Sequence, residues 1–266
     1  RQGLPQAFVP SIIQDRQGFI WMTTRDGLCR YDGINFKVFQ PNSDGKPGLS
    51  SSSLSGIQLD RHDKIWIFSD ENDVDILDPV TEKFTNISRQ PFYRKHFARE
   101  VIGTFFVDKQ DRLWISFLSN KVVCIEPRTN RIHHYNRPPV PGYLPTFDSF
   151  LQDAQGTVWM SNKTGLYRLD QSQDRFISYA LPDNDIRGMH LRPNNQLFLV
   201  SPRSVMLLQP TTGQLSHIPL PANINVTDLW HHTQITADSK GNVYFNIYNQ
   251  LFRFNENKRF DLLTEL

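Results

Sequence analysis

One pattern recurs six times along these 266 residues, and it constrains the fold more than any other feature. In four copies an aspartate is followed six positions later by a tryptophan: Asp15/Trp21, Asp60/Trp66, Asp108/Trp114 and Asp153/Trp159. Two degenerate copies follow at Arg192/Phe198 and Asp238/Tyr244. Successive copies start 39 to 48 residues apart, so the pattern is an internal repeat rather than a chance spacing.

Each copy also contains the signals of four short β-strands. The turn after the aspartate reads DRQG, DAQG or DSKG in three copies, where Asp can bond the local backbone and Gly can accept a positive φ. Further on, each copy has an apolar-x-x-apolar pair that ends at a polar residue, as in Leu28/Tyr31 before Asp32. A fourth apolar marker opens the last strand of each copy, at Phe36, Phe84, Ile132, Phe176, Leu215 and Phe260.

These signals predict an all-β fold. A four-stranded sheet of this length has two partly apolar faces, so it must stack on neighbouring sheets. Repeats of ~40–45 residues with four strands each are typical of β-propeller blades, and no segment keeps a helical period through three turns. The sequence therefore predicts a β-propeller of four-stranded antiparallel blades as a single domain over residues 1–266. The six recognisable blades are expected near residues 8–42, 54–89, 101–137, 147–181, 185–220 and 228–263.

The repeated side chains have a structural explanation. A tryptophan at one equivalent mid-strand position per blade suits packing between blades, because it buries a large area and keeps one N–H to satisfy. The repeated aspartates are expected to form turns rather than to act as catalytic acids. Cys29 and Cys124 fall on the predicted third strands of blades that are not neighbours, so both are expected to be free and mostly buried.

The composition argues against several classes of function. The 29 basic and 27 acidic residues leave a formal net charge of +2, too balanced for a protein that binds nucleic acid. No apolar run approaches the ~18 residues that could span a membrane. The paired histidines His133/His134 and His231/His232 are adjacent, so on a strand their side chains point to opposite faces and do not readily share one metal ion. We expect no cofactor, no metal site and no catalytic residues.

The wording of the first copy, SIIQDRQGFIWMTTRDGLCRYDG, closely resembles the two-component regulator propeller repeat. The segment FLQDAQGTVWMSNKTGLYRLD, from Phe150 to Asp170, has the same pattern, and the resemblance extends over nearly the whole chain, from Leu4 to Leu263. Such repeats occur in the periplasmic sensor regions of hybrid two-component systems of Gram-negative bacteria that degrade complex polysaccharides. In that family, fourteen repeats typically build two seven-bladed propellers, followed by a β-sandwich, a transmembrane helix, a histidine kinase and a response regulator.

The resemblance implies a sensory, non-enzymatic domain in the periplasm, with the full-length protein anchored in the inner membrane as a histidine kinase. Only six copies are present and the chain starts at Arg1, so we expect an excised N-terminal fragment with six blades of a seven-bladed propeller, and closure as a smaller ring is the open alternative. The implied partners are an oligosaccharide ligand, acidic or neutral, and the second propeller and downstream signalling modules of the same chain. A homodimer is an open alternative.

A ligand site is expected on the loops between blades and on those between second and third strands, which share one face of a propeller. The most unusual is RQPFYRKHFARE, from Arg89 to Glu100, where cations alternate with aromatics. Arg can bind a carboxylate or sulfate through two hydrogen bonds and an aromatic ring can stack on a sugar, although a solvated loop or short helix is the structural alternative. The predicted ligand-binding residues are Arg25, Asp70, Asn72, Tyr93, Arg94, Lys95, His96, Lys163, Arg203 and Trp230. The turn YDGIN, Tyr31 to Asn35, lies on the opposite face and is left out.

Two other functions stay open. A propeller enzyme similar to the streptogramin lyases would need a metal and a histidine or carboxylate pair near the central channel, and His190 and His231 are the histidines near inner strands. A protein-interaction scaffold would instead use a propeller face or an open edge to bind a partner or its own copy. Turnover or a specific divalent metal in the purified protein would favour the enzyme, and a dimer measured by light scattering would favour the scaffold.

Overall fold

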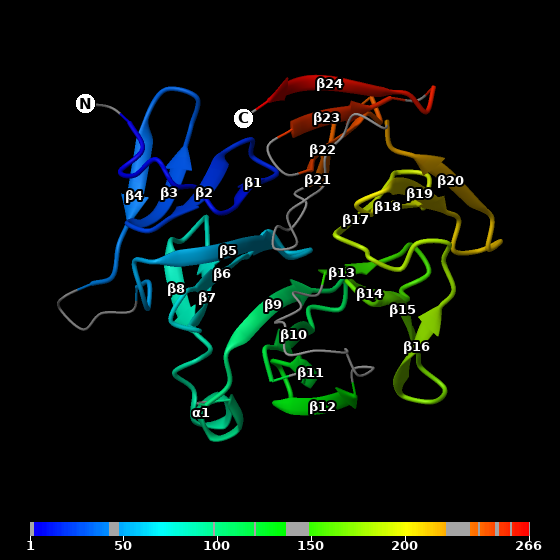
Figure 1. Cartoon of the computed structure of the whole chain (residues 1–266). Coiled ribbons are helices and arrows are strands. Elements are labelled where there is room, and N and C mark those ends of the chain that lie inside the picture. Colours follow the sequence, from blue (N-terminus) through cyan, green and yellow to red (C-terminus); the bar gives the residue numbers. More distant parts are fainter. Residues whose placement is uncertain are drawn as a thin grey trace. The chain divides into compact units, whose positions relative to one another are not determined.

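A computed structural model of the chain describes residues 3–42, 48–97, 99–119, 121–136, 149–221, 235–238, 240–247, 250–255 and 257–265. Their strands form six separate four-stranded antiparallel sheets, which follow one another along the chain from β1–β4 to β21–β24 (Figure 1). Within every sheet, strands that are consecutive in sequence are hydrogen-bonded neighbours. The chain is therefore an all-β propeller with six four-stranded blades, which confirms the predicted fold class.

The strands of the first three blades are β1 (Ile12–Gln14), β2 (Ile20–Thr24), β3 (Gly27–Tyr31), β4 (Phe36–Phe39), β5 (Leu54–Leu59), β6 (Ile65–Ser69), β7 (Val74–Asp78), β8 (Lys83–Asn86), β9 (Ile102–Val107), β10 (Leu113–Phe117), β11 (Lys121–Glu126) and β12 (Arg131–Asn136). Those of the last three are β13 (Ser149–Gln152), β14 (Val158–Asn162), β15 (Gly165–Asp170), β16 (Arg175–Tyr179), β17 (Gly188–Leu191), β18 (Leu197–Val200), β19 (Ser204–Leu208), β20 (Leu215–Pro219), β21 (Ile235–Ala237), β22 (Val243–Ile247), β23 (Gln250–Phe254) and β24 (Phe260–Glu265).

The chain divides into two compact units, which share the third blade. The first unit comprises Arg1–Ile102, Phe106–Trp114 and Ile125–Ile132, and the second comprises Gly103–Phe105, Ile115–Cys124 and His133–Leu266. The expectation of one domain over residues 1–266 stays a prediction.

The six-residue spacing between aspartate and tryptophan has one structural cause. In the first blade, Asp15 Oδ1 accepts the backbone N–H groups of Gln17 and Phe19 at 3.0 and 2.9 Å, which closes the turn between β1 and β2. The other oxygen, Oδ2, accepts the indole N–H of Trp21 at 2.7 Å. Trp21 is fully buried, so the residue that forms the turn also satisfies its single polar group.

The same arrangement recurs in the other blades. The indole N–H groups of Trp66, Trp114 and Trp159 donate to the aspartates six positions before them at 3.1, 2.8 and 2.9 Å. In the sixth blade the Tyr244 hydroxyl donates to Asp238 at 3.1 Å. The fifth blade has Phe198 at this position, a side chain with no polar group to satisfy. The predictions of turn-forming aspartates and packing tryptophans are both confirmed.

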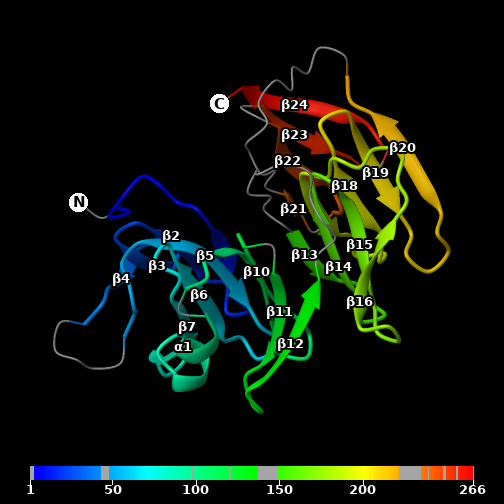
Figure 2. The ribbon, with the colours of Figure 1, turned by 60° about the horizontal axis from the view of Figure 1, so that its bottom comes forward.

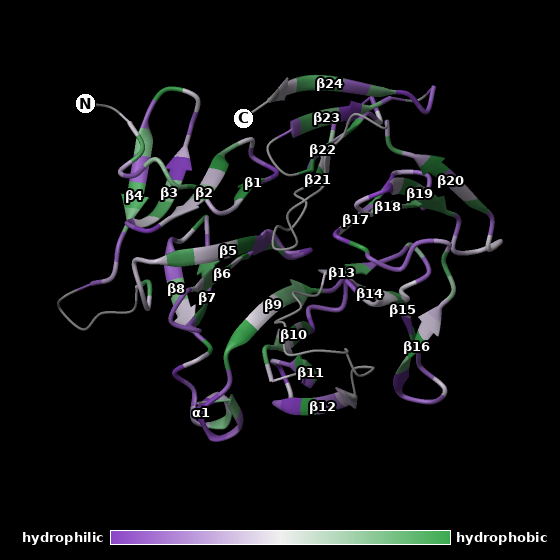
Figure 3. Cartoon of the chain, in the orientation of Figure 1, coloured by the Kyte–Doolittle hydropathy of each residue, from purple (hydrophilic) through white to green (hydrophobic). Residues whose placement is uncertain are grey.

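Apolar clusters fill the space between neighbouring sheets within each unit. Trp21 and Leu28 of the first blade pack against Leu54, Ile57 and Ile65 of the second. In the second unit, one cluster joins the fourth and fifth blades and another joins the fifth and sixth. Figure 3 shows the result along the chain, with apolar segments on the strands and hydrophilic residues concentrated at the turns. Cys29 on β3 and Cys124 on β11 are buried and free, as predicted.

The fourth residue of each turn between first and second strands has a left-handed backbone conformation. Glycine fills it in three blades, but Asp63, Asp111 and Asn195 occupy it in the others with φ of 61°, 61° and 60°. Each of these side chains bonds to the preceding blade. Asp63 pairs with Arg16 at 3.5 Å, Asp111 pairs with Arg61 at 3.0 Å, and Asn195 Oδ1 accepts the N–H of Ala154 at 2.7 Å. These bonds offset the strain of a non-glycine residue in this conformation.

Two substitutions at Asn195 separate backbone strain from the bonds between blades. Asn195→Gly removes the bonds to Ala154 and Gln155 but relieves the strain, whereas Asn195→Ala removes the same bonds and keeps it. We expect the alanine variant to lose about 2 kcal/mol of unfolding free energy, and the glycine variant about 1 kcal/mol less than that. Urea denaturation of the two variants checks this, and equal losses would show that strain at this position is negligible.

Candidate ligand-binding site

The segment expected to bind ligand contains the one helix of the described ranges, α1 (Pro91–Phe97). Proline at the first helical position suits a helix start, because its missing N–H would have no partner there. Tyr93 and Phe97 lie four residues apart on one face of α1, where both are buried with their ring centroids 5.0 Å apart. Figures 1 and 2 show α1 after β8, beside the second blade.

Cations occupy the exposed side of α1. Arg94, Lys95 and His96 are exposed in its last turn, where positive charge is favoured near the carboxyl end of a helix. Tyr93, by contrast, is only 5% exposed, and burial raises the pKa of its hydroxyl, with the charge of Asp73 adding to the shift. The helix therefore separates the alternating pattern of the sequence into an aromatic inner side and a cationic outer side. In the proposed site Tyr93 supports the helix rather than stacking on a ligand.

The turn between β6 and β7 holds both ends of the α1 segment. Before the helix, the Ser88 hydroxyl donates to Asp73 Oδ1 at 2.8 Å. After it, the backbone N–H of Ile102 donates to Asn72 Oδ1 at 2.8 Å. A loop between blades and a turn between second and third strands therefore lie together, as expected for one face of a propeller. Asp70, in the same turn, accepts the Ser53 hydroxyl at 2.6 Å.

The other predicted site residues are distributed over both units. Arg25 stacks over the ring of Phe8, with its guanidinium carbon 4.8 Å from the ring centroid. Lys163 and Arg203 lie in the β14–β15 and β18–β19 turns of the second unit, and Arg203 is exposed. Trp230 lies outside the described residues. Asp70, Asn72 and the α1 cations all lie in the first unit, where the β6–β7 turn is bonded to the segments before and after α1.

A buried carboxylate that the sequence reasoning missed lies beside this site. Asp75 on β7 is 2% exposed and accepts both the N–H and the hydroxyl of Ser50 at 2.7 Å, as well as the Asn86 side-chain amide. Asp75 therefore connects β7 and β8 of the second blade to Ser50, in the loop between the first and second blades. Burial raises the pKa of Asp75. The available signal was the charged residue inside the apolar run VDIL of a predicted third strand.

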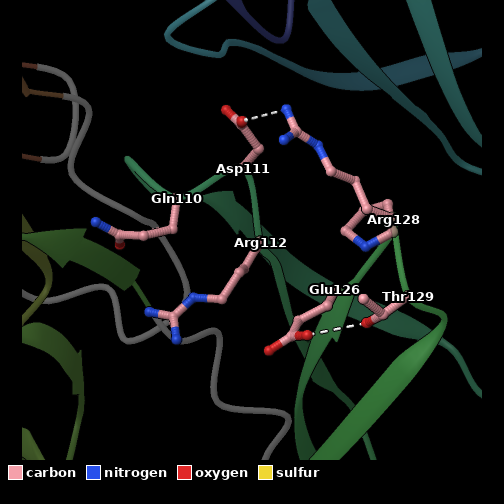
Figure 4. Close-up of a pocket in the computed structure, with 7 residues that line it drawn as sticks. Gln110, Asp111, Arg112, Glu126, Arg128 and Thr129 are labelled. Atoms are coloured by element: carbon pink, nitrogen blue, oxygen red, sulfur yellow. Dashed lines mark hydrogen bonds and ion pairs between the residues drawn. The ribbon is translucent and has the colours of Figure 1, made fainter.

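A pocket of about 350 Å³ lies at the opposite end of the third blade (Figure 4). Its lining comes from the β9–β10 and β11–β12 turns: Gln110, Asp111, Arg112, Glu126, Pro127, Arg128 and Thr129. The charged groups are paired within the protein. Arg112 binds Asp108 at 2.7 Å, Arg128 binds Asp111 at 3.3 Å, and Thr129 donates to Glu126 at 2.9 Å. The sequence analysis considered the other face and so missed this pocket.

The enzyme alternative can be compared with the described residues. Among them, no group of three or more His, Cys, Asp or Glu side chains is arranged to hold a metal ion. His190 lies on β17, where burial lowers its pKa and the charge of Arg192 adds to the shift. His231 lies outside the part of the chain that the structure describes. No helix of the described residues is long and apolar enough to cross a bilayer.

Comparison with known proteins identifies the repeat. Residues 3–26 match the family described as two component regulator propeller. Histidine kinase P4 of Formosa agariphila is 42% identical over 48 residues, which cover 18% of this chain and 4% of that protein.

Solved structures identify the fold over almost the whole chain. The extracellular domain of the putative hybrid two component system BT3049 from B. thetaiotaomicron matches 99% of this chain, with a TM-score of 0.75 and 19% identity. The corresponding domain of BT4673 matches 97%, with a TM-score of 0.68 and 15% identity. PorZ, a surface component of the type-IX secretion system of Porphyromonas gingivalis, matches 99%, with a TM-score of 0.65 and 10% identity.

The chain spans about a third of each of these structures, 36%, 36% and 34% of their lengths. At such low identities the structural likeness establishes the fold alone, and PorZ has that fold in a different system. The repeat type comes from the family match at the first blade. The chain is thus a six-bladed β-propeller that carries a two-component regulator propeller repeat.

Proposed function

We propose that this chain is the extracytoplasmic sensory domain of a two-component signalling protein and that it binds an oligosaccharide from polysaccharide breakdown. The observation that carries the proposal is the match over 97–99% of the chain to extracellular domains of hybrid two-component systems. A periplasmic location, and a histidine kinase elsewhere in the full-length protein, belong to the same proposal.

The exposed cations of α1 are the proposed contact for an acidic oligosaccharide. Arg94 can hold a carboxylate or sulfate with two parallel hydrogen bonds, and Lys95 adds a second positive charge on the next residue. Because both side chains are exposed, their attraction for the ligand is screened by salt. Asp70 and Asn72 lie in the turn that holds α1, where their oxygens can accept sugar hydroxyls.

A ligand on α1 would act on the junction between the second and third blades. The α1 segment is bonded to the β6–β7 turn through Ser88, and the same turn is bonded to the start of β9 through Asn72. A ligand that fits one arrangement of this junction better than another shifts the equilibrium between the two. In the full-length protein, the signalling modules would respond to this shift in equilibrium.

Calorimetric titration with acidic and neutral oligosaccharide digests tests the proposal. We expect saturable binding of an acidic digest, weakened about 10-fold or more in the Arg94→Ala/Lys95→Ala variant because two charged contacts are lost. Lys83→Ala/Arg131→Ala is the matched control, since it removes two exposed cations at the opposite ends of the blades. An equal loss in both variants would contradict the placement on α1, and no binding of any digest would contradict oligosaccharide recognition by this chain. Homodimerisation, the remaining partner prediction, is checked by light scattering.

A further inference from the structure

The two most exposed large apolar side chains of the described residues lie at the ends of the blades opposite α1. They are Ile34, 76% exposed in the β3–β4 turn, and Val80, 75% exposed in the β7–β8 turn. In an antiparallel sheet of four consecutive strands, the first and third turns lie at one end and the second turn at the other. We call the first and third turns of the first unit the turn face: residues 15–19, 32–35, 60–64, 78–82, 108–112 and 126–130.

Both apolar residues are held at their turn tips by the same construction. Asp32 Oδ1 accepts the backbone N–H groups of Ile34 and Asn35 at 2.8 and 2.6 Å. Asp78 Oδ1 accepts those of Val80 and Thr81 at 3.0 and 3.3 Å. In each turn the apolar residue is the second one after the aspartate, so a fixed backbone displays it to solvent.

The equivalent turn of the fourth blade is built in the same way but has a polar tip. Asp170 Oδ1 there accepts the N–H of Ser172 at 2.9 Å, and Ser172 is the second residue after the aspartate. The turn therefore does not require an apolar side chain at this position, and a serine is compatible with its backbone. Ile34 and Val80 thus have no evident role in forming their turns.

The two apolar turns are neighbours. Lys37, at the start of β4, binds Glu82 of the β7–β8 turn at 2.6 Å, and Arg30 reaches the same carboxylate at 3.4 Å. Ile34 and Val80 therefore stand on adjacent turns that an ion-pair cluster joins.

Basic side chains on the turn face are more exposed than the acids they pair with. Arg16 is 68% exposed against 27% for Asp63, and Arg61 and Arg128 are 49% and 76% exposed against 12% for their shared partner Asp111. Lys37 is likewise more exposed than Glu82, and Lys64 is more exposed than Asp78. Arg30 is the exception, because it is less exposed than its partner Glu82. The six cations of these ion pairs share four carboxylates, and in all but the Arg30 pair the positive charge is the more exposed of the two.

These three arginines form a connected row. Arg16 donates to the backbone carbonyl of Arg61 at 2.9 Å, and Arg61 and Arg128 meet on one oxygen of Asp111. The cations therefore extend over the first, second and third blades, while the apolar tips stand on the first and second. A surface with cations around protruding apolar residues is typical of proteins that bind the interface of an anionic bilayer.

We propose that the turn face docks on an anionic phospholipid surface, with Ile34 and Val80 entering the boundary between headgroups and acyl chains. Arg16, Arg61 and Arg128 would then meet the phosphate groups. Each apolar side chain stands singly on its own turn, which suits insertion into a fluid phase. A stable protein interface instead needs a continuous, close-packed apolar core. A soluble polyanion would use the arginines but would leave the apolar tips without a role.

Co-sedimentation with phosphatidylcholine vesicles, with and without phosphatidylglycerol, tests this inference. We expect saturable binding only to vesicles that contain phosphatidylglycerol, weaker at higher salt. Ile34→Ser/Val80→Ser, which copies the tip of the fourth blade, should weaken binding about 10-fold or more. Arg16→Ala/Arg128→Ala should do the same, because it removes the two most exposed cations of the row. Circular dichroism melting of each variant shows that the fold is retained.

The matched control is Val101→Ser combined with Arg94→Ala and Lys95→Ala. It removes one exposed apolar residue and two exposed cations from the α1 side. We expect this variant to bind vesicles like the parent chain. No binding by the parent, or an equal loss in the control, would overturn the proposal. Dextran sulfate tests for a soluble polyanion. If Ile34→Ser/Val80→Ser bound both dextran sulfate and vesicles as well as the parent does, the turn face would be a site for soluble polyanions instead. The oligosaccharide titrations are independent, since Ile34→Ser/Val80→Ser leaves α1 intact.

Discussion

Replacing Trp159 by alanine is expected to lower the free energy of unfolding by about 3–5 kcal/mol. The side chain is 1% exposed and packs against Leu151 and Leu166 of its own blade and Leu197 and Leu199 of the next. Alanine would leave a cavity between the two sheets and would also remove the indole N–H from the buried carboxylate of Asp153. Both effects have the same sign. Denaturation with urea, followed by tryptophan fluorescence and circular dichroism, measures the loss.

A conservative variant separates packing from hydrogen bonding at this position. Trp159→Phe keeps most of the apolar volume but removes the indole hydrogen bond to Asp153 Oδ2, so we expect a loss of about 1–3 kcal/mol. The double variant Trp159→Phe/Asp153→Ala should lose less than the sum of the two single changes, because each change alone removes the same hydrogen bond. Additive losses would contradict the coupling. The fifth blade, with Phe198 and Arg192 at the two repeat positions, lacks both the indole and the carboxylate.

Replacing Asp75 by alanine is expected to cost about 3–5 kcal/mol, because the Ser50 N–H, the Ser50 hydroxyl and the Asn86 amide would all lose their shared acceptor. The loop that joins the first and second blades would lose its attachment to β7. Asp75→Asn keeps the shape and one acceptor oxygen, so its loss should be smaller. Hydrogen exchange at the Ser50 amide gives a local readout, and unchanged protection there in Asp75→Ala would contradict the role of this carboxylate.

The pH dependence of Asp75 has a definite sign. Its pKa is raised in the folded protein because burial disfavours the charged form. The stabilising contribution is therefore fully present below the ordinary value of 3.8, and it is lost as the pH rises through the folded pKa. The stability of the parent relative to Asp75→Asn should fall over that interval and then level off. A difference that stays constant with pH would show that the pKa of Asp75 is not raised.

The blades could be predicted from the sequence because their defining contacts are local. The hydrogen bonds of Asp153 to its turn and to Trp159 all lie within seven consecutive residues, so one short segment of sequence contains the whole network. The helix α1 could not be predicted with the same certainty. Seven residues are too few to display a helical period, and tertiary burial of Tyr93 and Phe97 supports it.

The candidate site was only partly accessible to sequence reasoning. The loops and turns that share one face follow from strand order, and the bond from the Ile102 N–H to Asn72 joins one such turn to the segment after α1. Which side of α1 faces solvent depends on the blade beneath it, and this is why Tyr93 is buried while Arg94 is exposed. The burial of Asp75 likewise depends on the loop that connects the first blade to the second.

The sequence by itself determined the repeat, the four strands of each blade and the roles of its aspartates and tryptophans, since all of these depend on contacts within a few residues. Tertiary structure alone decided which charges lie outermost. The exposure of Arg16 over Asp63 and the burial of Asp75 both arise where segments distant in the chain meet. Burial depends on what covers a side chain, and in a propeller the covering residues usually belong to the neighbouring blade.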